Sequence, residues 1–95
     1  MLLKIKQLII ENKGYKRSIK HKNIYVNSNS IVSISDYEGA SSFLLSEGSE
    51  YHSDSFSLVK VSQGNRTDDI IAFGTAEKLY AEIKETSLGK TIING

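Results

Sequence analysis

The stretch IIAFGTAEKLYAEIKE, residues 70–85, decides the fold because it joins two hydrophobic patterns of different period. Its first four residues form an apolar run that is typical of a buried strand, and Gly74-Thr75 follows at once. Beyond Thr75, apolar residues recur at i, i+3, i+4 and i+7, which predicts an amphipathic helix over 75–86 with Thr75 as its N-cap. We therefore expect a strand that turns directly into a helix packed on the sheet.

The Gly74-Thr75 junction also has a second interpretation, as a phosphate-binding turn at a helix N-terminus. Such a turn normally needs several backbone amides from a glycine-rich loop, with Lys and Ser or Thr after it. This junction contains one glycine, and no Lys-Ser or Lys-Thr pair follows it. The residues therefore favour a helix cap.

The rest of the chain reads as short strands separated by polar turns. Residues 2–10 alternate, with Leu3, Ile5 and Ile9 on one face and lysines on the other. ENKGYKR and QGNRTD have the glycine and polar residues of hairpin turns. Further extended segments are expected at 18–22, 23–27, 30–38, 55–62 and 69–74, and a brief strand is expected within FLLSEGSEYH (43–52), after a break at GASS.

These elements predict a single α+β domain over residues 1–95, with one small curved antiparallel sheet or partial barrel of about five strands and one C-terminal helix packed on it. Gly89 is placed to end that helix. The open edges of so small a sheet are compatible with a homodimer formed by strand pairing. The core is expected to contain Leu3, Ile5, Ile9, Ile24, Val26, Val32, Ile34, Val59, Val61, Ile71, Phe73, Leu79 and Ile83.

Composition limits the class of protein. The 95 residues carry a net charge of +1 and include no cysteine, which excludes disulfides and thiolate metal sites. A charge so close to balance gives no general attraction to nucleic acid or to a membrane surface. The N-terminal MLLKIKQLII has lysines where a signal peptide would be apolar, and no apolar run is long enough to span a bilayer. We expect a cytoplasmic protein with no membrane contact.

The charged residues are segregated along the chain. Residues 1–24 are basic, whereas residues 36–57 contain acids and neither Lys nor Arg. The basic segment suits nucleic-acid binding through Lys13, Tyr15, Lys16, Arg17, Lys20 and Lys22. The acidic, serine-rich segment suits a basic protein surface, contacted by Asp36, Tyr37, Glu38, Glu47, Glu50 and Asp54. The two segments could instead neutralise each other, within the fold or across a homodimer, and lysines on an edge strand also oppose aggregation.

Catalytic signals are weak. Glu50, His52 and Asp54 alternate, so on a strand they would share one face and could ligate a divalent ion or orient the imidazole as a base. The segment is rich in serine and lacks an obvious fourth ligand, which favours a solvated acidic loop. The many serines include no G-x-S-x-G elbow. We therefore predict no catalytic residue, no metal and no cofactor.

Two segments carry a resemblance to a known family: NIYVNSNSIVSISDYE (23–38) and SLVKVSQGNRTDDIIAFGTAEKLYAEI (57–83). Their layout, I-x-V-N before I-V-x-I and then strand, turn, strand and closing helix, resembles FlbD-like small β-rich proteins. The resemblance covers roughly residues 23–84 and departs at the basic N-terminus and at the serine-rich insert of residues 39–57. It implies a regulatory or scaffolding module and assigns no functional residue.

In size, composition and lack of catalytic motifs, the chain is also similar to small phage accessory proteins, including anti-CRISPR inhibitors of host defence. The functional hypothesis is a non-enzymatic module that binds a macromolecule, of the phage-type inhibitor class. Its acidic segment would bind a host protein that handles nucleic acid. Direct nucleic-acid binding through residues 13–22 is the alternative.

Overall fold

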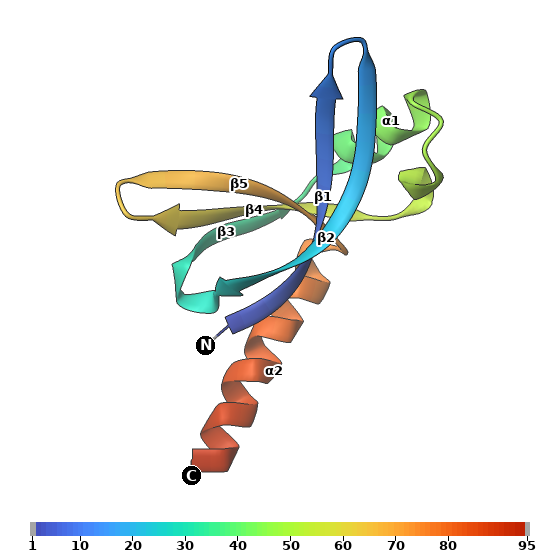
Figure 1. The fold of residues 1–95 in the computed structure, drawn as a ribbon. Helices are drawn as coiled ribbons and strands as arrows, with labels where there is room; N and C mark the ends of the chain where they lie inside the picture. Colours follow the sequence, from blue (N-terminus) through green and yellow to red (C-terminus); the bar gives the residue numbers. More distant parts are fainter. Residues whose placement is uncertain (1, 95) are drawn as a thin grey trace.

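The computed structural model describes residues 2–94, with side chains for residues 2–85. Five antiparallel strands form one sheet in the order β2-β1-β5-β4-β3, and two α-helices complete an α+β fold (Figure 1). The chain order is β1 (Leu2–Lys13), β2 (Lys16–Asn27), a 3₁₀ turn η1 (Ser28–Ser30), β3 (Ile31–Asp36), α1 (Glu38–Ser46), a 3₁₀ turn η2 (Glu50–Ser53), β4 (Phe56–Gln63), β5 (Arg66–Phe73) and α2 (Ala76–Asn94). Among these described helices, none has the length and apolar character needed to cross a membrane.

Two tight hairpins build most of the sheet. Lys13 pairs with Lys16 around the loop Gly14-Tyr15, and Gln63 pairs with Arg66 around Gly64-Asn65. Both glycines have φ of 65°, and the residue after each has a negative φ, which is the geometry of type II′ hairpin turns. The two predicted turns are therefore confirmed. β2 is one continuous strand of 12 residues, although the sequence predicted two shorter segments there.

The central strands are apolar on both faces, so the sheet supports two hydrophobic clusters. On β5, Ile70 and Ala72 point into one cluster, whereas Ile71 and Phe73 point into the other. The first cluster, packed under α2, contains Leu3, Ile5, Val59, Val61, Ile70, Ala72 and Leu79. The second, packed under α1, contains Leu8, Ala40, Leu44 and Phe56.

β1 contributes to both clusters because its buried residues change face along the strand. Leu3 and Ile5 enter the cluster under α2, whereas Leu8, on the alternate face, enters the cluster under α1. The prediction that β1 has one apolar face is therefore wrong beyond Ile5. Ile9, expected in the core, is only partly buried.

Val32 is a second correction to the expected core, because 63% of its surface is exposed. The register of β3 against β4 shifts between Ile31 and Ser33, so Val32 lies at an irregularity and alternation no longer turns it inward. Ile31 and Ile34 on either side pack against the first cluster.

The segment after β3 is helical, and the brief strand predicted within residues 43–52 is wrong. Ala40 and Leu44 are buried and one helical turn apart, with Phe43 packed beside them. The helix ends at Ser46, and Gly48 follows the C-cap residue Glu47 with a φ of 70°. The amides of Gly48 and Ser49 donate to the Leu45 and Leu44 carbonyls over 3.1 and 3.0 Å. This is a Schellman termination, so the predicted turn at Gly48 exists but closes a helix.

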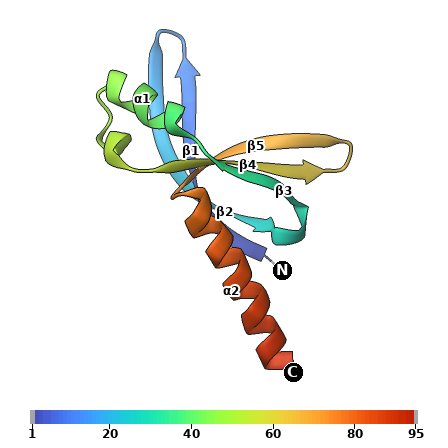
Figure 2. The ribbon, with the colours of Figure 1, turned by 180° about the vertical axis from the view of Figure 1, so that it is seen from behind.

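The start of α2 confirms the cap interpretation of Gly74-Thr75. Thr75 Oγ1 accepts the Lys78 backbone N–H over 3.2 Å, and Asp36 Oδ1, from the end of β3, accepts the Ala76 N–H over 2.9 Å. Gly74, with φ of 106°, makes the turn, and its amide donates to the Ser55 carbonyl over 2.8 Å. The helix runs through Gly89 to Asn94, longer than the predicted 75–86, and extends away from the sheet at the end opposite α1 (Figure 2).

The second cluster predicts a sharp contrast between two neighbouring leucines. Leu44 is 0% exposed and Leu45 is 63% exposed. We expect Leu44→Ala to lower the free energy of unfolding by about 2–5 kcal/mol, since it leaves a cavity. Leu45→Ala, its control, should change that energy by less than about 0.5 kcal/mol. Urea unfolding followed by circular dichroism measures both. Equal effects would contradict the assignment of Leu44 to the core.

The Asp36 cap predicts a second stability effect. Asp36→Ala should cost about 1 kcal/mol because an orphan amide of the first helical turn loses its acceptor. Asp36→Asn is the matched control, since its side-chain oxygen can still accept the Ala76 N–H. Thermal unfolding of the three proteins compares them. If the alanine and asparagine variants lost the same stability, the carboxylate charge would matter more than the hydrogen bond.

Candidate functional site

The predicted acidic segment does not form one continuous acidic surface. Asp36 caps α2, Glu47 forms an ion pair with Arg17, and Asp54, which follows η2, lines a groove that also contains three lysines. Glu38 and Glu50 lie exposed in the first turns of α1 and η2. Several of these carboxylates therefore have structural partners inside the molecule.

Tyr37, the aromatic member of the predicted acidic set, lies at the junction between β3 and α1. Its backbone N–H donates to the Phe56 carbonyl over 2.9 Å, and its ring lies against Gly39, where an added Cβ would come within 3.2 Å of Cε1. The side chain is 38% exposed. Tyr37 therefore fixes the start of α1 while keeping an accessible edge.

The predicted basic segment forms the upper part of the β1–β2 hairpin, with Tyr15 exposed at its tip. Strand alternation places Lys13, Lys16, Lys20 and Lys22 on one face. Lys13 and Lys20 on this face contact Glu11, with Nζ 3.5 and 3.8 Å from its Oε2. The single negative charge of Glu11 offsets one of the four positive charges on this face, which lowers its positive potential.

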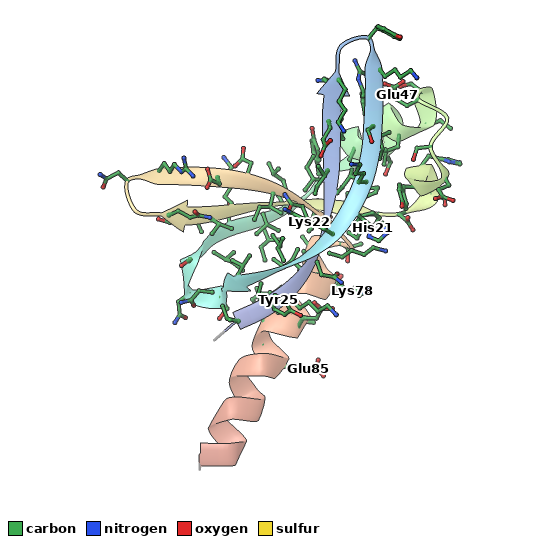
Figure 3. The ribbon with its side chains drawn as sticks, in the orientation of Figure 1. His21, Lys22, Tyr25, Glu47, Lys78 and Glu85 are labelled. Atoms are coloured by element: carbon green, nitrogen blue, oxygen red, sulfur yellow. The ribbon has the colours of Figure 1, made fainter. Side chains whose placement is uncertain are left out.

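Arg17 lies on the opposite face of the hairpin and joins it to α1. Its guanidinium donates to Glu47 Oε1 and to Asn12 Oδ1, and Cζ lies 5.2 Å from the centroid of the Phe43 ring. Figure 3 shows Glu47 beside the upper part of the hairpin. Arg17 of the basic segment and Glu47 of the acidic segment therefore neutralise each other within the fold.

The three alternating residues considered for metal binding are not on a strand. Glu50 and His52 lie in η2 and Asp54 follows it, so the alternation no longer places them on one face. His52 Nδ1 is 2.8 Å from the Ser49 carbonyl oxygen. Within the described part of the chain, no group of three or more His, Cys, Asp or Glu side chains could hold a metal ion.

Sequence reasoning missed a groove of about 560 Å³ where β1, the end of β5 and the start of α2 meet. We call it the lysine groove, after the three lysines that line it: Lys4, Lys6 and Lys78. The carboxylates of Asp54 and Glu82, together with Asn23 and Phe73, also line it. The basic residues come from both ends of the chain, so no local sequence pattern could have shown the cluster.

The lysine groove exists because β1 and β5 separate. Their pairing in the sheet is fixed at Gln7 and Ala72, and β5 ends at Phe73, so the first residues of β1 have no strand beside them on this side. Lys6 Nζ lies 4.5 Å from the Phe73 ring centroid, and a Cβ at Gly74 would lie 3.5 Å from Lys78 Cδ. The Phe73 ring thus holds the Lys6 side chain at the groove, and the Lys78 side chain passes close to Gly74.

A second surface lies on the other flank of α2. A groove of about 520 Å³, here called the apolar groove, runs between β3 and α2 and is lined by Ser28, Ile31, Val32, Ser33, Ile34, Ala76, Glu77, Tyr80 and Ile83. Tyr80, like Val32, is largely exposed, with 59% of its surface accessible. Lys84 Nζ lies 5.7 Å from the centroid of the Tyr80 ring. The lining contains one ionisable carboxylate, that of Glu77.

Comparison with known proteins does not assign this chain to a family: no family model, curated protein or solved structure matches it. The resemblance to FlbD-like and anti-CRISPR-like proteins therefore stays a prediction. The two grooves of the molecule itself are therefore the basis for a functional proposal.

The contact between Arg17 and Glu47 predicts a small coupling energy. Both side chains are partly exposed, so a double-mutant cycle with alanine at each position should give about 0.2–1 kcal/mol, falling as salt is added. The control is a second cycle with Arg17→Ala and Glu50→Ala, since Glu50 is an acidic residue of the same predicted set. The effects of these two substitutions on the free energy of unfolding should add. Chemical unfolding measures every variant. A coupling equal to that of the control would show that the ion pair adds nothing to stability.

Proposed function

We propose that this chain is a non-enzymatic protein-binding module that holds an extended segment of its partner against β3. The observation that carries the proposal is Val32, an apolar side chain exposed on a strand at the edge of the sheet and next to the apolar groove. Added strands pair with the backbone of such an edge, and alternate side chains enter neighbouring pockets.

The two edges of the sheet differ in their chemistry. β2, at one edge, carries Lys16, Arg17, Lys20 and Lys22, which oppose pairing with another strand. β3, at the other edge, has no charged residue from Ile31 to Ser35, and its terminal Asp36 is bound to α2. The edge at β3 therefore lacks the charges that usually prevent strand addition.

Charge complementarity defines the partner segment. Residues 23–59 contain neither Lys nor Arg, Glu77 lines the apolar groove, and Asp36 lies beside it through its bond to the Ala76 N–H. A segment with alternating apolar residues and flanking Lys or Arg fits this surface. As the sequence predicts, an acidic surface of this chain would bind a basic partner, but that surface is now centred on β3 and the apolar groove.

The sequence-based hypothesis names a more specific partner than a basic segment: a host protein that handles nucleic acid. A host protein that handles nucleic acid has the basic surface that the proposal needs, and a phage-type inhibitor acting in the cytoplasm would meet it there. Both remain part of the proposal. Identification of the bound protein tests them.

A lysine on the edge strand should abolish partner binding. Val32 is exposed, so Val32→Lys should leave the fold intact while placing a charge on the edge, and retention of the partner should fall at least about tenfold. Leu45→Lys is the matched control, because Leu45 is equally exposed but lies on α1. Tagged proteins are used to isolate partners from nuclease-treated lysate of the source cells.

A protein retained by the wild type and by Leu45→Lys but lost from Val32→Lys would support the proposal. Retention of the same protein by the wild type and both variants would contradict it, as would no retention by any of the three. Sedimentation velocity of the purified chain tests the homodimer. If the wild type is a dimer and Val32→Lys is a monomer, the segment that pairs with β3 belongs to a second copy of this chain and not to another protein.

A further inference from the structure

The lysine groove brings together three ammonium groups that are far apart in the sequence. Lys4 and Lys6 come from β1 and Lys78 comes from the first turn of α2. They outnumber the carboxylates of Asp54 and Glu82, so the groove carries net positive charge. Its volume of about 560 Å³ lies within the usual range of ligand clefts. An anionic ligand fits this balance better than a neutral or cationic one.

The anion would be held by side chains and not by the helix N-terminus. Thr75 and Asp36 already accept two of the first free amides of α2, those of Lys78 and Ala76. Lys6 is placed over the Phe73 ring, so less side-chain entropy is lost when this lysine binds a phosphate.

An exposed aromatic ring lies next to the groove. Tyr25 pairs directly with Lys4 across β1 and β2, so both side chains project from the same face, and 64% of Tyr25 is exposed. Figure 3 shows Tyr25 on β2 and Lys78 on α2, both near the end of the sheet where α2 begins. The neighbouring pair, Lys6 and Asn23, adds an amide that can bond to the edge of a base.

We infer that the lysine groove binds single-stranded nucleic acid, with phosphates on Lys4, Lys6 and Lys78 and an unpaired base stacked on Tyr25. A base can stack on an aromatic side chain only when it is not already stacked in a duplex, so the site selects single strands. The groove shares no lining residue with the apolar groove, so this inference does not rest on protein binding at β3.

The β1–β2 hairpin face is the competing surface. It carries Lys13, Lys16, Lys20 and Lys22, but Glu11 contacts two of these lysines. A cavity of about 370 Å³ at the hairpin tip is lined by Tyr15 and Lys16 together with Arg17, which is already paired with Glu47. Lys22 lies on the same strand as Tyr25 but on the opposite face. This separation supplies a matched control for charge reversal.

Fluorescence anisotropy of the full chain with a labelled oligothymidylate of about 12 nucleotides tests the inference, against a duplex of the same length. Three phosphate contacts predict a slope of about −2 for the logarithm of the binding constant against the logarithm of salt concentration. Lys4→Glu/Lys78→Glu should weaken binding at least about tenfold and reduce that slope. Lys16→Glu/Lys22→Glu should stay within about twofold of the wild type.

Tyr25 variants separate stacking from charge. Tyr25→Ala should weaken binding about tenfold, whereas Tyr25→Phe should retain most of it because the ring is kept. Circular dichroism and thermal unfolding confirm that each variant is folded. Val32→Lys should bind the oligonucleotide normally, which keeps the test independent of the β3 edge.

Four results would overturn the inference. The first is no binding by the wild type at low salt, and the second is tighter binding to the duplex. The third is an equal or greater loss from Lys16→Glu/Lys22→Glu, which would place the site on the hairpin face. The fourth comes from a competition experiment, in which inorganic phosphate or free thymidylate is titrated at constant ionic strength against the bound oligonucleotide. If phosphate displaces the oligonucleotide as well as thymidylate does, and Tyr25→Ala has no effect, the groove is a small-anion site and the inference fails.

Discussion

The structure depends on one strand that is buried on both faces. β5 lies in the middle of the sheet, and its four consecutive apolar residues divide between two clusters: Ile70 and Ala72 under α2, Ile71 and Phe73 under α1. A sheet with one apolar face would need one covering helix, but this strand requires cover on both sides. Helix α1 is therefore as necessary to the fold as α2, although the two helices bury different faces at different ends of the sheet.

The same strand explains where the two grooves lie. β5 stops at Phe73 and turns through Gly74 into α2, which leaves the first part of β1 without a strand beside it and opens the lysine groove. Asp36 then ties the end of β3 to the start of α2, so the helix runs alongside β3 and forms the wall of the apolar groove. One flank of α2 presents Lys78 and Glu82, and the other presents Glu77 and Tyr80.

Local patterns could predict the elements but not the surfaces. The strand-to-helix junction and both hairpin turns follow from periodicity and glycine, and the structure confirms them. The segment Phe43-Leu44-Leu45 resembles a strand when read alone, and only the i, i+4 spacing of Ala40 and Leu44 indicates a helix. Val32 is exposed by a register shift between two strands, and Lys4 meets Lys78 only through tertiary packing. Such features depend on pairing partners that are distant in sequence.

The arrangement of charge argues against a surface built for electrostatics alone. Glu11 and Glu47 contact three exposed cations of the hairpin, Lys13, Arg17 and Lys20, which lowers the field that would attract nucleic acid to this region. In the lysine groove, by contrast, the Lys6 ammonium lies over the Phe73 ring, and the largely exposed Tyr25 lies on the neighbouring strand. The proposed binding there would depend on positioned contacts more than on net charge, so a net charge of only +1 does not argue against it.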